Sequence, residues 1–196
     1  MLDSKDFEKY TKPDPEAFWR GKRRPAVYYD PKYSGKLTAR QKKAMDEKDE
    51  PVVGCDKIIE LTNEILKAGG FNPVVTPILK GDLLTEILDH SFDDKYYERK
   101  LKPYGLSSAS QLIWMRFAND GHLGVVAASN DINFDHDTHS YRIIEPCKLD
   151  WDKSFVLIFP LSANINYNRD EVETAVGNYL IENKVPILDY YSHNYH

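Results

Sequence analysis

Residues 111–129 constrain the fold of this chain most, because they carry the pattern of a β-hairpin. Two apolar runs flank Asp120-Gly121, a pair that favours a two-residue turn in which both residues take positive φ angles. A turn at these two residues sets the register of the two strands. It pairs Phe117 with Gly124, Met115 with Val126, and Ile113 with Ala128.

The other face of this hairpin is also largely apolar. It carries Trp114, Arg116 and Ala118 against Leu123, Val125 and Ala127. Two apolar faces are typical of central strands that are covered on both sides. Arg116 and His122 flank the turn, and we give their spacing little weight as a sign of chemistry.

Three more segments have the pattern of strands. Residues 155–159 are apolar at every position, which predicts a central strand. A short link joins them to residues 141–145, so an antiparallel pair is the economical arrangement of these two segments. Residues 185–191 form the last predicted strand.

Two helices stand out. The first covers residues 56–68, has one apolar face and ends at Gly69-Gly70. The second begins after Asn168, which is its N-cap, and Glu171 completes a capping box. The buried face of the first helix is predicted to hold Ile58, Leu61, Ile65 and Leu66, and that of the second Val172, Ala175, Val176, Tyr179 and Leu180. Shorter helices are predicted at residues 38–48, from Gly81, and at residues 93–101.

The N-terminal quarter differs from the rest in charge. Residues 1–50 hold 13 Lys/Arg and 10 Asp/Glu, a net charge of +3, whereas residues 51–196 hold 13 and 21, a net charge of −8. The first segment is rich in proline and aromatic residues and shows little periodicity. We therefore expect an α+β fold in which residues 51–196 form a mainly antiparallel sheet of about five strands with three to four helices, and residues 1–50 form an extended arm.

Composition excludes several classes of protein. No apolar run approaches the length of a membrane span, and the first residues lack the apolar core of a secretory signal. Cys55 and Cys147 are too few for a disulfide framework and read as reduced thiols, so we expect a cytoplasmic protein. The richness in Lys, Asn, Asp and Tyr suggests a bacterial origin. The net charge of −5 argues against nucleic acid as an obligatory partner.

The polar loop at residues 130–139 is the candidate metal site. It presents Asp135, His136, Asp137 and His139, whose oxygens and nitrogens are ordinary ligands of divalent metals. A bound metal would activate a water for hydrolysis, and the fold could bring in His90. The alternative is a solvated loop whose Asp and Asn side chains bond their own backbone, and the lack of a known ligand motif favours this alternative.

A basic cluster in the N-terminal quarter is the second candidate site. Arg20, Lys22, Arg23 and Arg24 lie beside aromatic residues, a combination that can grip a phosphate backbone and stack on bases. The alternative is that these cations pair with the acidic body, either within one chain or between two copies. The excess of carboxylates in the body favours pairing with acidic groups.

No catalytic motif meets its structural requirements, so the leading functional hypothesis is a non-enzymatic binding or regulatory protein. It would act through protein–protein contacts, including self-association as a dimer. A metal-dependent hydrolase using the loop of residues 131–139 is the alternative, and nucleic-acid contact through the basic arm is a weaker one. The sequence leaves open whether the protein is an enzyme.

Overall fold

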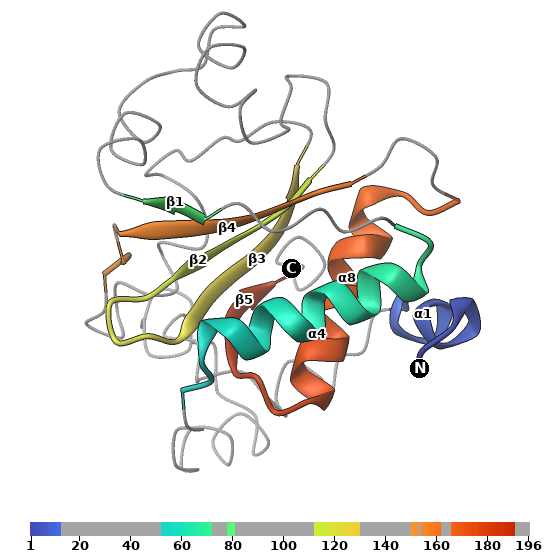
Figure 1. The fold of residues 1–196 in the computed structure, drawn as a ribbon, viewed down its shortest axis with the longest axis horizontal. Coiled ribbons are helices and arrows are strands. Elements are labelled where there is room, and N and C mark those ends of the chain that lie inside the picture. Colours follow the sequence, from blue (N-terminus) through green and yellow to red (C-terminus); the bar gives the residue numbers. More distant parts are fainter. Residues whose placement is uncertain are drawn as a thin grey trace, which may run out of the picture.

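The computed structural model describes residues 1–12, 52–71, 78–80, 112–129, 150–152, 154–161 and 166–190. These residues form an α+β fold, as the sequence predicts, in which three helices pack against one sheet (Figure 1). The helices are α1 (Ser4–Tyr10), α4 (Cys55–Ala68) and α8 (Arg169–Glu182). The strands are β1 (Ile78–Lys80), β2 (Leu112–Phe117), β3 (Leu123–Ser129), β4 (Phe155–Pro160) and β5 (Ile187–Tyr190).

The sheet is mixed, with the strand order β1-β4-β2-β3-β5. Neighbours are antiparallel except β3 and β5, which are parallel. The chain reaches β5 through α8, the helical crossover that a parallel pair requires. β4 lies between β1 and β2, which confirms its prediction as an interior strand. The strand predicted at residues 141–145 lies outside the described residues, as do the helices predicted at 38–48, from Gly81, and at 93–101.

The hairpin forms as predicted, but its turn is different. Met115 pairs with Val126 and Ile113 with Ala128, as the sequence indicates, whereas Phe117 pairs with Leu123 instead of Gly124. The pairing of Phe117 differs from the prediction for two linked reasons. The loop contains one more residue than predicted, and a bulge then restores the register of the strands.

Hydrogen bonds define this loop. The Ala118 amide donates to the His122 carbonyl, and the Gly121 amide donates to the Ala118 carbonyl. Gly121 has a φ of 92°, whereas Asp120 does not take a positive φ, so the predicted two-residue turn with two positive φ angles is wrong. The register then shifts between Arg116 and Phe117, which makes Gly124 an extra residue in β3 and turns Leu123 towards the core.

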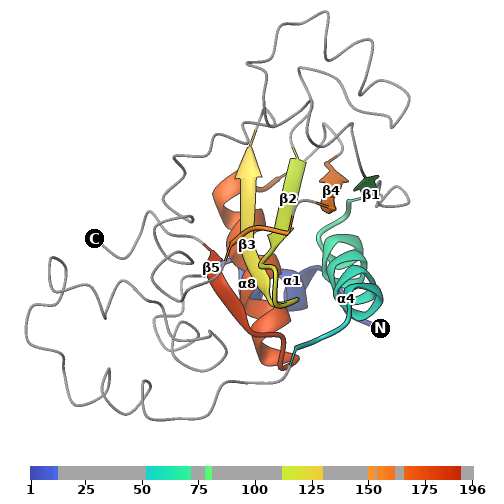
Figure 2. The same cartoon turned by 90° about the vertical axis from the view of Figure 1, so that its left-hand side faces the viewer.

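The main core lies between the helices and one face of the sheet, and Figures 1 and 2 show α1, α4 and α8 grouped on that side. Ile113, Met115, Phe117, Leu157 and Phe159 supply the sheet side of this core. The helix side includes every residue predicted for the two long helices: Ile58, Leu61, Ile65, Leu66, Val172, Ala175, Val176, Tyr179 and Leu180.

The opposite face of the sheet is buried as well. Its side chains include Leu112, Trp114, Arg116, Ala118, Val125, Val156 and Ile158, each at most 7% exposed. None of the described helices packs on this face, and Trp151 lies over it. Both faces of the central strands are therefore committed to packing, as their two apolar faces indicate.

The first residues of the N-terminal quarter are helical, so the expectation of an extended arm is wrong for residues 4–10. Asp3 caps α1, and its side chain accepts hydrogen bonds from the amides of Lys5 and Asp6 while Asp6 returns a bond to the Asp3 amide. Phe7 is fully buried in the core between α4 and α8. A helix of seven residues is too short to be stable alone, so this packing maintains it. The division of the chain at residue 50 stays a prediction.

Both long helices end in the same backbone motif. After α4, the Phe71 amide donates to Leu66 and the Gly70 amide to Lys67, with Gly70 at a φ of 82°. These are the two bonds of a Schellman motif, which confirms the predicted glycine stop. α8 repeats the motif, but Lys184 occupies the left-handed position with a φ of 65°. None of the described helices is long and apolar enough to cross a membrane.

Replacing Lys184 with glycine should stabilise the protein. A side chain in the left-handed region carries a steric cost that glycine avoids, so Lys184→Gly should raise the free energy of unfolding by about 1 kcal/mol. Lys184→Ala is the matched control, because it removes the same charge and keeps the strained Cβ. Urea denaturation followed by circular dichroism measures both, and equal stabilities of the two variants would contradict the assignment of strain to this position.

Truncating Phe7 should show how firmly α1 is attached to the body. Phe7→Ala removes a fully buried ring and should lower the free energy of unfolding by about 3–5 kcal/mol. Lys5→Ala, on the exposed side of the same helix, should change it by no more than about 0.5 kcal/mol. The same denaturation experiment decides, and a Phe7→Ala variant as stable as Lys5→Ala would mean that α1 is not part of the core.

Candidate functional site

The predicted site residues lie outside the part of the chain that the structure describes. This holds for the metal candidates Asp135, His136, Asp137, His139 and His90, and for the basic cluster Arg20, Lys22, Arg23 and Arg24. Both sites therefore stay predictions. Within the described ranges, no group of three or more His, Cys, Asp or Glu side chains is placed to hold a metal ion.

The structure brings other polar side chains together at the turn end of the β2–β3 hairpin. Residues 150–152 run beside the end of β2, where Trp151 forms an isolated β-bridge with Ala118. The Asn119 amide donates to the Asp150 carbonyl at 2.8 Å, and the Asp152 amide donates to the Phe117 carbonyl at 2.8 Å. We call the residues gathered here, Asp120, His122, Arg116, Asp150 and Trp151, the hairpin-end cluster.

Arg116 is the centre of the hairpin-end cluster. It is 1% exposed, and its guanidinium carbon lies 4.5 Å from the centre of the Trp151 ring. Burial lowers the pKa of Arg116 to about 10, and the negative charge of Asp150 opposes that fall. The guanidinium therefore keeps its positive charge at neutral pH. Its Nε–H has no hydrogen-bond partner among the described residues.

The energetics of Arg116 are unusual for a structural residue. Removing a cation from water costs several kcal/mol, and a cation–π contact with a desolvated tryptophan returns about 2 kcal/mol. A buried arginine normally recovers the remainder through an ion pair with a carboxylate. In the described part of the chain no ion pair reaches Arg116, and Asp150 acts on it through the field alone.

Trp151 is held over Arg116 by the backbone of β3. Gly124 lies directly under the indole, and a Cβ at this position would collide with the ring. The bulge that makes Gly124 an extra residue therefore also creates the space for Trp151. The indole Nε1–H is a second buried donor without a hydrogen-bond partner in the described ranges.

His122 and Asp120 form the outer part of the cluster. Nδ1 of His122 lies 3.0 Å from Oδ2 of Asp120, and the His122 amide donates to the other carboxylate oxygen at 3.2 Å. His122 is 7% exposed and lies opposite Ala118, whose amide donates to the His122 carbonyl. Arg116 and His122, whose spacing carried little weight in the sequence, thus come from the two sides of the hairpin, with His122 opposite the residue two positions after Arg116.

Sequence reasoning missed Trp151. It belongs to the link that precedes β4, which the sequence analysis treated as a simple connection. Two signals were available: a tryptophan between two aspartates, Asp150 and Asp152, and, earlier in the chain, a strand with small residues such as Gly124 and Ala127. Small residues on that strand leave room for a helix or a large aromatic side chain, but the sequence does not say which one fills it.

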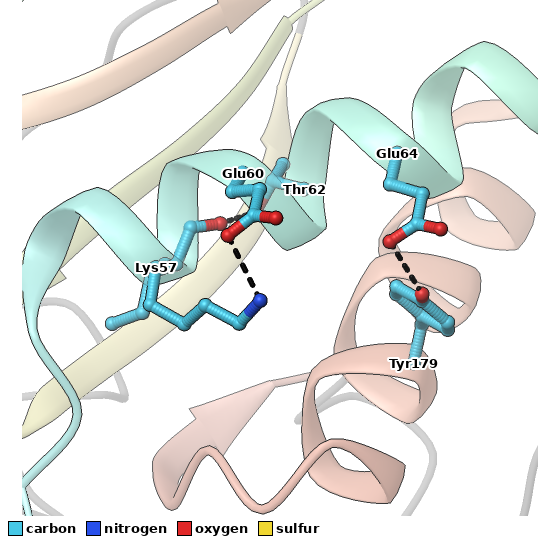
Figure 3. A network of polar contacts seen from close by, with 6 residues as sticks. Lys57, Glu60, Thr62, Glu64 and Tyr179 are labelled. Atoms are coloured by element: carbon cyan, nitrogen blue, oxygen red, sulfur yellow. Dashed lines mark hydrogen bonds and ion pairs between the residues drawn. The ribbon is translucent and has the colours of Figure 1, made fainter.

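A second polar network lies between the helices and is structural (Figure 3). The hydroxyl of Tyr179 on α8 donates to Oε2 of Glu64 on α4 at 2.8 Å. Tyr10 of α1 packs edge-on against Tyr179, with ring centres 5.2 Å apart. Burial is the main cause that raises the pKa of Tyr179 to about 12, and the bond to Glu64 adds to it. The network joins the three helices.

Comparison with known proteins adds no family to this geometry: no protein family, no curated protein and no solved structure matches the chain. The interpretation of the hairpin-end cluster therefore depends on its own chemistry.

The Tyr179–Glu64 bond should make stability depend on pH in the alkaline range. The folded state favours the neutral phenol, so the stabilisation is complete below pH 10.0, the ordinary pKa, and is lost as the pH rises towards about 12. Tyr179→Phe should cost about 1 kcal/mol at pH 7 and make the alkaline loss of stability shallower. Thermal unfolding between pH 8 and 12 measures it. Tyr167→Phe is the control, since that ring contacts Phe7; identical slopes for wild type and Tyr179→Phe would refute the assignment.

Proposed function

We propose that this chain is a non-enzymatic binding protein that acts through contacts with protein partners, of which a second copy of the chain is the first candidate. The observation that supports this most directly is the docking of α1, which seats the start of the basic N-terminal quarter on the acidic body. The basic residues that follow α1 would then make contact with acidic protein surfaces.

The contacts of α1 show what kind of surface receives it. Lys9 lies 3.6 Å from Glu182 of α8, and the side-chain amide of Asn178 donates to the carbonyls of Tyr10 and Lys12 at 3.0 and 2.9 Å. The ion pair is exposed and contributes little energy. The ion pair is relevant because of the charges it joins: a cation of the N-terminal quarter contacts a carboxylate of the body.

The use of the polar side chains in the described residues also supports a binding role. Asp3, Asp6, Asn168 and Glu171 cap helices, Glu64 joins α4 to α8, and Glu173 accepts the Ala128 amide at 2.8 Å. Both faces of the central strands are buried. These polar side chains and strand faces serve the fold itself. We therefore expect the charged surface to make the contacts with partners.

Self-association should depend on the basic cluster and on salt. We expect a dimer of the full chain at about 50 mM salt that dissociates at about 500 mM, because counter-ions screen contacts between exposed charges. Reversing Arg20, Lys22, Arg23 and Arg24 to glutamate should give a monomer at both salt concentrations. Light scattering coupled to size-exclusion chromatography measures the mass.

The matched control reverses four exposed cations of the body: Lys57, Lys67, Arg169 and Lys184. This variant has the same net charge as the first and a more acidic body, so it should keep the dimer. A full-length protein that has the mass of one chain at both salt concentrations would rule out the second copy as partner. Loss of the dimer in both variants would show that net charge, rather than the basic cluster, controls association.

A further inference from the structure

We infer that the hairpin-end cluster is a binding site for a small oxyanion with a single negative charge, of the carboxylate class, which pairs with Arg116. This inference is independent of the proposed function, because it uses other residues and the opposite face of the sheet. It has three grounds: a buried cation with no ion-pair partner among the described residues, two buried donors with no acceptor among them, and the charge of the surrounding residues.

The first ground is the charge of Arg116. The side chain is 1% exposed and stays protonated at neutral pH, while the two carboxylates of the cluster bind other groups. Asp150 accepts the amide of Trp151 at 2.7 Å, and Asp120 holds His122. A bound anion would give the guanidinium the charged partner that a buried arginine ordinarily has.

The second ground is the pair of donors. Nε–H of Arg116 and Nε1–H of Trp151 are both buried without acceptors in the described residues, and the two groups are stacked on each other. Buried donors are rarely left unsatisfied in a folded protein. A water could accept from either donor but cannot balance the charge. An anion with two oxygens meets both requirements, since a guanidinium offers parallel N–H groups to a carboxylate.

The third ground concerns selectivity. Three aspartates, Asp120, Asp150 and Asp152, lie within a few residues of Arg116 or Trp151 along the chain, and the first two are exposed. Three negative charges this near to the guanidinium repel a doubly charged anion such as phosphate more strongly than a singly charged one. The charge pattern therefore favours a monocarboxylate over inorganic phosphate.

The cluster is also rigid, as a binding site needs to be. The segment 150–152 is tied to the hairpin by backbone hydrogen bonds, and the side-chain oxygen of Asn119 accepts the Asp150 amide at 3.3 Å. The indole of Trp151 rests on Gly124, so its ring is fixed over the guanidinium. Little ordering is left to accompany binding, which favours affinity for a small ligand.

Thermal unfolding of the full chain with acetate, phosphate or chloride at matched ionic strength tests this inference. Acetate at about tenfold above its dissociation constant should raise Tm by about 3–5 °C over chloride, and the rise should saturate. Phosphate should give a smaller rise. Arg116→Met should lose the response to acetate while remaining folded, because an apolar side chain of similar length suits the buried position. Arg169→Met, at an exposed arginine, should respond as the wild type does.

Trp151→Phe gives a second measurement that does not depend on the Arg116 variant. It keeps a ring over Arg116 and removes Nε1–H, so acetate should bind several-fold more weakly. If Tm follows ionic strength alone, water or other residues of the chain already satisfy the donors, and the inference is overturned. An acetate response that survives in Arg116→Met overturns it as well. A larger rise with phosphate than with acetate would overturn the carboxylate assignment.

Discussion

β2 is the element on which the rest of the structure depends, because it is paired on both sides and buried on both faces. Antiparallel hydrogen bonding joins it to β3 and β4, and each of its six residues is buried. One face supplies Ile113, Met115 and Phe117 to the core beneath the helices, while the other carries Trp114 and Arg116. A strand in this position cannot shift its register without moving a whole set of side chains to the wrong face, so it fixes the alignment of its neighbours.

The bulge in β3 links this packing to the candidate site. The loop of the hairpin takes in one residue more than an ideal two-residue turn, and Gly124 compensates for it, so that Leu123 still reaches the core. The same glycine leaves the space in which Trp151 lies over Arg116. The residue that restores the register, Gly124, thus also lies beneath Trp151 in the hairpin-end cluster. Bulges occur often beside functional sites.

The helices pack around α8, which contacts α1 and α4 as well as β3 and β5. Tyr179 and Asn178 of α8 bind α4 and the end of α1 through side-chain hydrogen bonds. Because α1 is too short to fold alone, its place in the core shows that the chain is anchored to the body by residues 4–10. Asn178, Tyr179 and Glu64 thus find their hydrogen-bond partners among the helices, whereas the Nε–H of Arg116 and the Nε1–H of Trp151 have no acceptor in the described residues.

The sequence by itself determined the features that depend on neighbours along the chain: the hairpin over residues 111–129, the apolar strand at 155–159, the capping box at Asn168 and Glu171, and the glycine stop after α4. Periodicity and caps act within a few residues, so they can be read directly. Only the tertiary structure decided the bulge at Gly124, the helical start of the chain and the meeting of Arg116 with Trp151. Those features depend on contacts between residues far apart in sequence. A local pattern cannot predict such contacts, because many side chains of suitable size could have filled the same space.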